Sequence, residues 1–330
     1  MSLKQQLEST ASHVNNFILS KLEGKPRDLY LASSHYVKSG GKRLRPFLVI
    51  KSCEVFGGRG KCALPVAAAV EMVHNFTLIQ DDIMDNDLVR HNVSTVHKFY
   101  GIPLAILAGD ILFSKAFQAL AVDGKKAGLP DNIISQLVSK LAQSCLDVTE
   151  GQALDIDMAS NTKFLSESQY INMISKKTAA LFSTSCEMGA ICALAKKTDI
   201  ENIAGFGRNL GIAFQIVDDL IGVTGDPEVT KKPVGNDIRE GKKTLPILLA
   251  IEKAKGEDKD RILKVFGSKS ATDAELRASV DALTSIGVDH EVRKLARSYA
   301  SKATKSLKRY DSKAKYSLQS LADFIVERTL

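Results

Sequence analysis

Apolar residues recur at spacings of three and four along most of this 330-residue chain, whereas strict alternation of apolar and polar residues is scarce. Long windows of this kind cover residues 102–122, 133–146 and 203–217. Because a helix brings residues three and four apart onto one face, the pattern predicts amphipathic helices. The eight prolines fall where such helices would begin or be separated, and no proline clearly interrupts a helix. The sequence therefore predicts an all-α protein.

Two segments join an apolar stretch to an acidic end. Residues 63–85 are apolar and rich in alanine as far as Ile79 and then turn acidic, and residues 202–219 follow the same course. Each segment predicts one buried helix that ends in carboxylates. Loops are expected at residues 57–61, 125–131 and 225–241.

No Pro/Ser-rich linker and no low-complexity tract divides the chain. Its hydrophobic content of 44% is enough to bury a sizeable core. We therefore expect one large helical domain over residues 1–330.

Two clusters of aspartates stand far apart, Asp81, Asp82 and Asp85 in the first and Asp218 and Asp219 in the second. On a helix at about 100° per residue, Asp81 and Asp85 lie about 40° apart on one face. Carboxylates that close repel one another, so the cluster makes sense if cations neutralise it, and all-oxygen ligands suit Mg²⁺. A solvated acidic helix end is the alternative interpretation.

Basic residues occur where a polyanion would need them. Gly40 and Gly41 precede Lys42, Arg43 and Arg45, and glycines let backbone N–H groups approach a phosphate closely. Any one of these cations alone could be an ordinary surface charge, but all of them beside two aspartate clusters indicate a polyphosphate site. Further cations and neighbouring hydroxyls are Arg90, Lys177, Thr178, Lys242, Lys243 and Thr244.

The net charge of +7 is concentrated in residues 293–309, where seven positions are Lys or Arg and none is acidic. Aromatic content of 6% and the absence of a nucleic-acid-binding motif argue against a nucleic-acid partner. A solvated helix face is the favoured interpretation of the basic run. Attraction of an anionic substrate, or peripheral contact with an anionic membrane surface, is the alternative.

The five cysteines match no spacing typical of metal or redox sites, so we expect reduced thiols in a cytoplasmic protein. The N-terminal residues lack the pattern of a secretory signal. No stretch reaches the roughly 18 apolar residues that a membrane span needs, so none is expected.

At this point the chain resembles the head-to-tail trans-prenyl diphosphate synthases, also called polyprenyl synthetases. The resemblance covers nearly the whole length in matching order and spacing. It rests on GGKRLRP from residue 40, DDIMDNDLVRH from 81, EGQALD from 150, KTAALF from 177, FQIVDD from 214 and GNDIREGKKTLP from 235.

The resemblance implies an all-α bundle around a central cavity, usually as a homodimer, in which an allylic diphosphate ionises and isopentenyl diphosphate attacks. It implies Mg²⁺ held by both aspartate clusters, and oxygen dipoles from Thr178 and Gln215 near the carbocation. The metal ligands would be Asp81, Asp82, Asp85 and Asp218, with Asp219 beside them. Arg90, Lys177 and Lys242 would contact the leaving diphosphate, and Lys42, Arg45 and His74 would bind isopentenyl diphosphate.

His74 illustrates two competing interpretations. A lone histidine in an apolar helix is usually a satisfied core residue. His74 nevertheless lies about 20° from the helix line of Asp81, so it faces the same way. With the resemblance in view, we interpret it as a phosphate donor.

The chain departs from the family pattern at a few positions. Gly222 stands where a third aspartate is usual, so one ligand is missing or replaced by Asp226 or by water. His91 replaces the second arginine of the substrate-binding segment, which predicts weaker or more pH-dependent binding of isopentenyl diphosphate. Asn92 and Ser94 replace the usual glycine and proline of the next loop.

Product length is expected to depend on side chains one or more turns before Asp81. Phe76 is the largest of them, and an aromatic at the fifth position upstream resembles the archaeal type of geranylgeranyl (C20) synthase. Ideal geometry is less decisive, because Phe76 lies about 140° around the helix from Asp81, whereas Thr77 and Val73 lie about 40° and 80° away. Thr77 and Val73 are small or modest, so a product longer than C15 has room. Ordinary core packing is the alternative role for Phe76.

A Mg²⁺-dependent prenyltransferase that makes geranylgeranyl diphosphate is therefore the leading hypothesis. A farnesyl or longer-chain synthase is the nearest alternative. A class I terpene cyclase would share the metal chemistry but would need neither the segment 40–45 nor His74. A non-catalytic synthase subunit would be expected to carry decayed motifs, and only Gly222 and His91 point that way.

Overall fold

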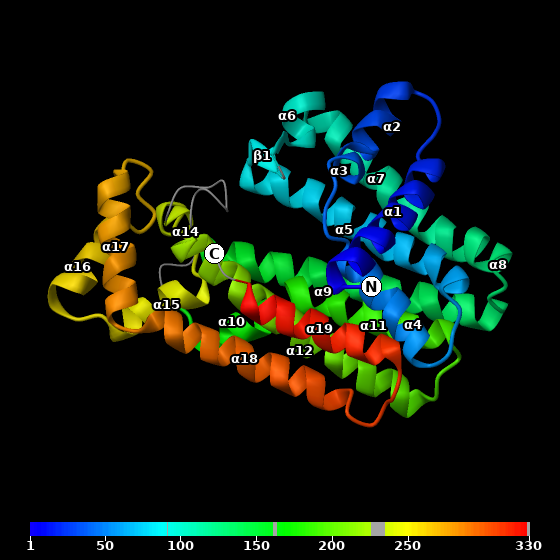
Figure 1. Ribbon diagram of the computed structural model, residues 1–330. Coiled ribbons are helices and arrows are strands. Elements are labelled where there is room, and N and C mark those ends of the chain that lie inside the picture. Colours follow the sequence, from blue (N-terminus) through cyan, green and yellow to red (C-terminus); the bar gives the residue numbers. More distant parts are fainter. Residues whose placement is uncertain (91, 161–163, 226–234, 329–330) are drawn as a thin grey trace. The chain divides into compact units, whose positions relative to one another are not determined.

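The computed structural model describes residues 1–90, 92–160, 164–225 and 235–328 (Figure 1). Nearly all of the regular structure in these ranges is helical, so the predicted all-α class is confirmed. Strands β1 (Val89–Arg90) and β2 (Val93–Ser94) pair antiparallel. The helices are α1 (Leu3–Lys21), α2 (Arg27–Ser33), α3 (His35–Lys38), α4 (Leu44–Val55), α5 (Gly60–Asp85), α6 (Val96–Tyr100), α7 (Ile102–Gln118), η1 (Ala119–Asp123), α8 (Gly124–Lys126), α9 (Asp131–Ser160), α10 (Glu167–Ile174), η2 (Ser175–Ala179), α11 (Ala180–Cys192), α12 (Lys197–Thr224), α14 (Asn236–Arg239), α15 (Leu245–Lys253), α16 (Gly256–Val265), α17 (Asp273–Ser285), α18 (Val288–Ser306) and α19 (Lys313–Glu327).

The three periodic windows all lie in helices. Residues 102–122 fall in α7 and the π-helical turn η1, residues 133–146 in α9, and residues 203–217 in α12. The segment 63–85 lies in α5, which ends at Asp85 as expected. The expectation that the second long helix ends in carboxylates was wrong, because α12 continues past Asp219 to Thr224. Buried Leu220 and Val223 extend its apolar face over that last turn.

Two smaller expectations also need correction. Pro65 lies inside α5, in its second turn, where its missing N–H costs only one hydrogen bond near the helix start. The expected loop 225–241 contains the short helix α14, and residues 226–234 of it lie outside the described ranges. The loop expected at 125–131 is present in shorter form, since α8 ends at Lys126 and α9 begins at Asp131.

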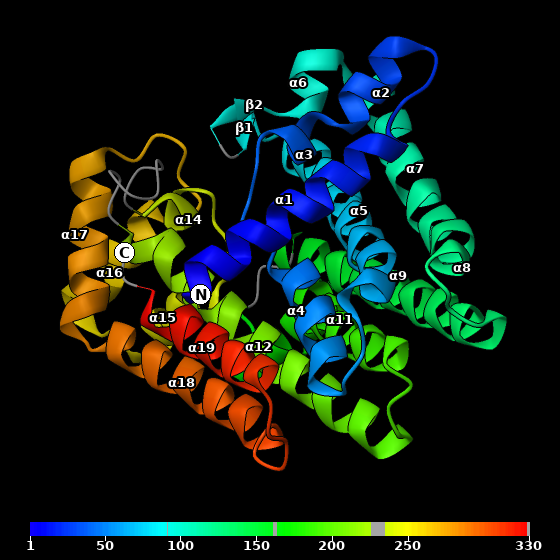
Figure 2. The same cartoon turned by 45° about the vertical axis from the view of Figure 1, so that its right-hand side comes forward.

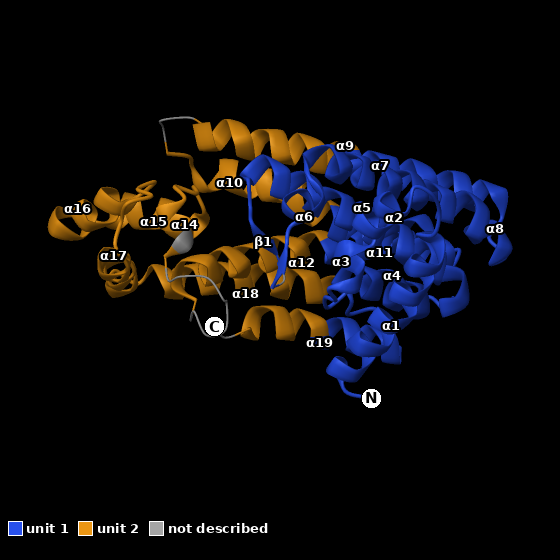
Figure 3. Cartoon of the chain, turned by 90° about the horizontal axis from the view of Figure 1, so that it is seen from above, with its two compact units in different colours: residues 1–145, 181–207, 307–320 blue, residues 146–180, 208–306, 321–330 orange. Residues whose placement is uncertain are grey.

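The chain divides into two compact units (Figure 3). Unit 1 comprises residues 1–145, 181–207 and 307–320, and unit 2 comprises residues 146–180, 208–306 and 321–330. Each unit is assembled from three separate stretches, so neither is a simple half of the chain. The expectation of a single domain stays a prediction.

Helix α5 is the centre of unit 1. It packs against α7, α4 and α1, and Figures 1 and 2 show α5 and α7 side by side. Ala67, Ala68 and Ala69 are fully buried on α5, and such small side chains let neighbouring helices approach closely. The helix that carries the first aspartate cluster is therefore held on several faces.

Unit 2 has its own apolar core. Tyr170 of α10, Ile216 and Leu220 of α12 and Leu245 of α15 are all fully buried in it. Helix α10 begins with a capping box. The Ser166 hydroxyl accepts the backbone N–H of Gln169, and the Gln169 side chain accepts the backbone N–H of Ser166. The cap and the core together fix where α10 presents Tyr170.

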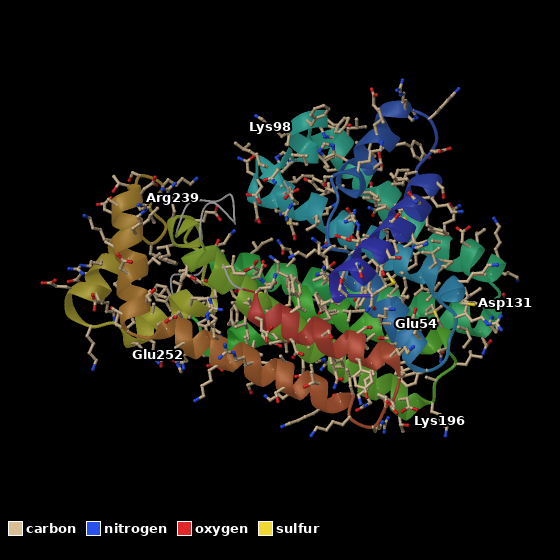
Figure 4. All side chains as sticks on the ribbon, viewed as in Figure 1. Glu54, Lys98, Asp131, Lys196, Arg239 and Glu252 are labelled. Atoms are coloured by element: carbon tan, nitrogen blue, oxygen red, sulfur yellow. The ribbon has the colours of Figure 1, made fainter. Side chains whose placement is uncertain are left out.

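Helix α18 carries most of the basic run. Its buried face consists of small apolar residues, from Val288 to Ala303, whereas Lys294, Arg297 and Lys305 are exposed. The favoured interpretation of this segment as a solvated helix face is therefore confirmed. Charged side chains on other helices also extend outward, such as the labelled Lys98 and Glu252 in Figure 4.

All five cysteines are free thiols in the structure. Helix α5 and residues 102–126 are long and apolar enough to cross a membrane by length and composition alone. Most of α5 is buried inside the protein, as in the core helix of a soluble protein, which passes the same test. The expectation of no membrane span rested on uninterrupted apolar runs and stays a prediction.

Candidate active site

The three aspartates of the first cluster lie in the last turn of α5 and differ in exposure. Asp82 is fully buried, Asp81 is half-buried and Asp85 is exposed. Residues four apart share a helix face, so Asp81 and Asp85 present their carboxylates together. Asp82 points away from that face into the protein.

Both carboxylate oxygens of Asp82 accept hydrogen bonds from other segments of unit 1. Tyr36 of α3 donates its hydroxyl to Oδ2, and Arg90 of β1 donates Nε–H to Oδ1 at 2.5 Å. The Tyr36 hydroxyl oxygen accepts the backbone N–H of Val96 at 3.2 Å. Burial and the hydrogen bond to Asp82 raise the pKa of the Tyr36 hydroxyl, so it remains a donor. Asp82 is thus held from two sides.

Arg90 lies against Asp82, and its Nη2 atom is also 3.7 Å from a carboxylate oxygen of Asp87. With a side chain about one-quarter exposed, Arg90 is anchored beside the first cluster. Its contact with a diphosphate stays a prediction.

His91 lies outside the described residues. Asn92 keeps a left-handed backbone with φ of 64°, the conformation that the usual glycine would adopt easily.

Arg43 takes no part in a phosphate site, which corrects the expectation of three cations behind the two glycines. Its Nη1 atom is 3.0 Å from Oε1 of Glu71, in a pair buried in unit 1. Its Nη2 and Nε atoms donate to the Val37 carbonyl at 2.9 Å and to the Asn15 side chain at 2.8 Å. Burial raises the pKa of Glu71, and the charge of Arg43 opposes that rise. Arg43 and Glu71 therefore form a buried ion pair, which positions the segment 40–45.

Arg45 and His74, two residues expected at the isopentenyl diphosphate site, lie together in unit 1. Nη1 of Arg45 is 3.1 Å from Nε2 of His74, and the guanidinium stacks over the Phe182 ring at 4.7 Å. Arginine can only donate, so Nε2 accepts and the proton of neutral His74 sits on Nδ1. Lys42 is exposed a few residues away. The pair supports a phosphate-binding role, which stays a prediction.

Gly151 allows two chain segments of unit 2 to meet without a side chain between them. A Cβ atom at residue 151 would overlap the backbone N–H of Lys177 and lie 2.6 Å from its Cα atom. Lys177 and Thr178 belong to the π-helical turn η2, and such turns occur frequently at functional sites. The glycine of the EGQALD segment therefore sets where η2 presents these two side chains.

The acidic residues of EGQALD pair with the basic residues of η2. Nζ of Lys177 is 2.5 Å from Oδ2 of Asp155, and Lys176 pairs with Glu150. Lys177 is about one-quarter exposed, so its ammonium remains accessible to an anion. Its predicted contact with the leaving diphosphate stays a prediction.

In the second pair, Asp218 is the accessible member. Its side chain is 52% exposed, and its Oδ1 atom is 3.6 Å from Nη1 of Arg328. Asp219 is buried. Each aspartate pair therefore combines a more accessible first carboxylate with a buried second one.

Asp219 belongs to a chain of hydrogen bonds within unit 2. Tyr170 donates its hydroxyl to Oδ2 at 2.6 Å, and Gln215 donates its Nε2–H to Oδ1 at 2.7 Å. Thr178 donates its hydroxyl to Oε1 of Gln215 at 2.7 Å. These contacts orient the Gln215 amide, because its nitrogen faces the carboxylate. Gln215 and Thr178, both predicted site residues, are thus brought together.

The environment of Asp219 disfavours its negative charge. Burial raises the pKa of the carboxyl to about 7, although the hydrogen bond from Tyr170 lowers it. The charges of Asp237 and Asp218 contribute to this raised pKa. A nearby cation would stabilise the ionised form of the Asp219 carboxyl. The second cluster thus has the electrostatics of a cation site.

Asp237 occupies the space beside Gly222. A Cβ atom at residue 222 would overlap the carboxylate of Asp237 and lie 2.8 Å from its Cγ atom. Asp237 is 8% exposed, and its Oδ1 atom is 3.8 Å from Nζ of Lys242. The third carboxylate of this cluster therefore comes from the next motif along the chain. Asp226, the alternative proposed from the sequence, lies outside the described residues.

Gly222→Ala is expected to lower the free energy of unfolding by about 1–3 kcal/mol, because buried Asp237 must move aside. Helix propensity alone predicts the opposite sign, since alanine usually stabilises a helix interior by about 1 kcal/mol relative to glycine. Urea denaturation measures the difference. Gly124→Ala is the control, because a Cβ there meets its nearest neighbour at 3.5 Å. A stabilising Gly222→Ala would show that Asp237 does not restrict this position.

The Phe76 side chain extends from α5 and packs against α7. Its ring centroid is 5.2 Å from that of Phe113, whose ring is 5.1 Å from that of Phe117. A Cβ at Gly109 would lie 3.2 Å from the Phe76 ring. The largest of the predicted product-length side chains thus belongs to an aromatic row.

The other two product-length residues lie nearby on α5. Val73 is buried, and Thr77 is half-buried with its hydroxyl donating to the His74 carbonyl at 2.8 Å. Neither side chain is large. Their effect on chain length stays a prediction.

Within the described ranges, no three or more His, Cys, Asp or Glu side chains are arranged to hold a metal ion by themselves. The accessible acidic groups offer oxygen donors only. A hard cation suits such donors.

A family model described as Polyprenyl synthetase matches residues 26–283 of the chain. The chain belongs to the polyprenyl synthetase family. This polyprenyl synthetase is 43% identical over 318 residues to the geranylgeranyl diphosphate synthase of Sulfolobus acidocaldarius, covering 96% of this chain and 95% of the relative. It is 39% identical over 321 residues to the geranylfarnesyl diphosphate synthase of Aeropyrum pernix, with coverage of 96% and 99%. The chain is therefore a trans-prenyl diphosphate synthase.

Solved structures agree with this assignment. The geranylgeranyl pyrophosphate synthetase of Pyrococcus horikoshii matches with a TM-score of 0.91 and 38% identity over 99% of this chain and 98% of that one. The geranylgeranyl pyrophosphate synthase of Corynebacterium glutamicum, described as complexed with isoprenyl diphosphate and magnesium, matches with a TM-score of 0.87 and 25% identity over 100% of both chains. This polyprenyl synthetase has the all-α isoprenoid synthase fold.

Several residues beside the polyprenyl synthetase motifs could not be singled out from the sequence. Tyr36 and Tyr170 lie outside every quoted motif, and no local pattern marks them. Gly151 and Asp237 lie inside motifs, so the motif itself was the available signal. Phe113 is one apolar residue among many in the pattern of α7.

Proposed function

We propose that this prenyl diphosphate synthase makes geranylgeranyl diphosphate (C20) by Mg²⁺-dependent, head-to-tail condensation of isopentenyl diphosphate with allylic diphosphates. The observation that carries the C20 product is the position of Phe76. It is the fifth residue before Asp81 on α5, and its ring packs against Phe113.

Chain growth stops when the hydrophobic tail meets side chains that it cannot displace. The Phe76 and Phe113 rings would form that barrier about one to two helical turns below Asp81. The location of this barrier leaves space for a chain longer than C15, since the side chains of Val73 and Thr77 are small or modest in size. Relatives are named for C20 and for C25 products, and a farnesyl or longer-chain synthase is the alternative.

Ionisation of the allylic diphosphate breaks its C–O bond, and diphosphate leaves with the electron pair. Lys177, Lys242 and Arg90 would absorb the growing negative charge, which lowers the barrier directly. Thr178 and Gln215 would direct oxygen dipoles at the allylic cation. The double bond of isopentenyl diphosphate then forms the new C–C bond, and the departed diphosphate accepts the proton that is lost.

The donor set fits Mg²⁺. Asp81, Asp85 and Asp218 are the accessible carboxylates, and Mg²⁺ usually takes one or two carboxylates together with phosphate oxygens and water. Such an ion would arrive with the diphosphate and needs no closed protein cage. When bound, it would neutralise charge on the leaving group.

Isopentenyl diphosphate would bind through Lys42, Arg45 and His74. The Arg45 guanidinium is already oriented by His74 and by the Phe182 ring, so less freedom is lost on binding. His74 would offer its Nδ1–H to a phosphate oxygen. The predicted pH dependence from His91 applies to this same substrate.

We also propose a cytoplasmic homodimer. Ile102, Ile106 and Leu107 of α7 are 53%, 42% and 50% exposed, and clustered apolar side chains of this kind favour a protein partner. A second copy of the chain is the partner expected of this family. The five free thiols are consistent with a reducing compartment. Light scattering of the purified protein measures the oligomeric state.

The product is tested by incubating the enzyme with Mg²⁺, isopentenyl diphosphate and each of the C5, C10 and C15 allylic diphosphates. Chromatography of the dephosphorylated products is expected to show a C20 alcohol from every allylic substrate. Omission of Mg²⁺ with a chelator present is expected to abolish it. A dominant C15 or C25 product would contradict the C20 proposal and leave the family assignment intact.

A further inference from the structure

We propose that Tyr170 is a positioning residue for the second aspartate pair, acting through Asp219 on Gln215 and Thr178. No sequence motif marks Tyr170, and its hydroxyl donates to the buried Asp219 rather than to the accessible Asp218. The proposal rests on the function proposed above, because positioning has meaning only where Asp218 and Asp219 meet a cation-bound diphosphate.

The first observation is the direction of the three hydrogen bonds that link Tyr170, Asp219, Gln215 and Thr178. Tyr170 donates to Asp219 at 2.6 Å, and Asp219 also accepts from Gln215 at 2.7 Å. Gln215 accepts from Thr178 at 2.7 Å. If the Tyr170 hydroxyl is removed, Oδ2 of Asp219 loses its donor and the carboxylate can rotate. Gln215 and Thr178 then lose the partner that orients them.

The second observation is the free-energy cost of burying the Tyr170 hydroxyl. Tyr170 is fully buried in the apolar core of unit 2, where phenylalanine would pack equally well. A buried hydroxyl is unfavourable unless it is hydrogen-bonded, and the Tyr170 hydroxyl donates its hydrogen bond to Asp219. The tyrosine is therefore explained by what it does to Asp219.

The third observation is that unit 1 repeats the arrangement. Asp82 is also the buried second member of its pair, and Tyr36 donates its hydroxyl to one of the carboxylate oxygens of Asp82. The two tyrosines come from unrelated segments, a short helix before the first cluster and α10 before the second. Two independent occurrences indicate that a fixed second carboxylate is a requirement of the aspartate pair.

Tyr170→Phe removes one oxygen atom and tests the proposal. Binding of inorganic diphosphate in the presence of Mg²⁺, measured by calorimetry, is expected to weaken roughly ten- to hundredfold, which is the effect of losing one hydrogen bond to a charged group. We expect kcat to fall by a similar factor, since small misplacements of reacting groups are costly. The matched control is Tyr299→Phe, which removes the same atom from a half-buried tyrosine packed against the same core.

A double-mutant cycle identifies the route of the effect. Diphosphate binding is compared for Tyr170→Phe, Asp219→Asn and the double variant. If Tyr170 acts through Asp219, the double variant binds no worse than Asp219→Asn alone. Additive losses would contradict the route.

A spectroscopic probe keeps the test valid if Tyr170→Phe fails to fold. With 3-fluorotyrosine at position 170, the ¹⁹F signal is expected to shift when Mg²⁺ and inorganic diphosphate are added, and the same probe at position 299 is not. An unmoved signal at 170, or unchanged diphosphate binding in a folded Tyr170→Phe variant, overturns the proposal. Failure of the wild-type enzyme to bind diphosphate with Mg²⁺ instead overturns the proposed function.

Discussion

Alanine at Asp81 or at Asp218 is expected to lower the rate of prenyl transfer roughly a thousandfold or more, while the helical fold and its thermal stability remain. Each residue is the more accessible carboxylate of its pair, so its removal would take away a proposed cation ligand and leave the core intact. Steady-state product formation measures the rate, and circular dichroism with thermal unfolding measures the fold. Retained activity in either variant would contradict the metal assignment.

Two further variants serve as controls for this prediction. Asp260→Ala removes an exposed aspartate of α16, outside both clusters, and should leave activity unchanged. Asp82→Ala is expected to differ from Asp81→Ala by also costing about 3 kcal/mol of stability, because Arg90 loses its buried partner. Equal thermal stability of the two variants would contradict the division of roles within the first cluster.

Phe76→Ala is expected to shift the main product from C20 to C25 or longer. Removing the ring, which packs against Phe113 and Gly109, would delete the proposed barrier, so the growing chain could extend by at least one more isoprene unit. Product length is measured by chromatography after dephosphorylation. The overall turnover should change less than the product distribution, because no diphosphate ligand is altered.

Phe56→Ala is the matched control for this change. It deletes the same ring from a residue that packs edge-on against Tyr310 at 5.1 Å, just after α4 and outside both aspartate clusters. Its products should keep the wild-type length. If Phe76→Ala also leaves the length distribution unchanged, Phe76 is an ordinary core residue and the length barrier lies elsewhere.

The two aspartate clusters follow one structural rule although their motifs differ. In each adjacent pair, Asp81–Asp82 and Asp218–Asp219, the first aspartate is the more accessible and the second is buried and accepts a tyrosine hydroxyl. The second motif lacks its third aspartate at Gly222, yet Asp237 supplies a carboxylate to that space. The departure from the family pattern at Gly222 therefore leaves an acidic group beside the helix.

The sequence by itself determined the helical class, the course of the long helices and the aspartate, lysine and arginine motifs. It could do so because these features depend on spacing within a few residues, as with the helical period that groups Asp81 with Asp85. The product-length hypothesis for Phe76 came from the family resemblance, because helical register alone places Phe76 about 140° around the helix from Asp81. The errors at Pro65 and in the loop 225–241 were also local, and they concerned where helices begin and end.

Only the tertiary structure decided which charged groups are available for chemistry. It separated Arg43, buried against Glu71, from Arg45, which donates a hydrogen bond to His74, although both belong to one motif. Tyr36 reaches Asp82 across 46 residues and Tyr170 reaches Asp219 across 49. Contacts between residues that far apart depend on how helices pack, and no local spacing encodes that packing.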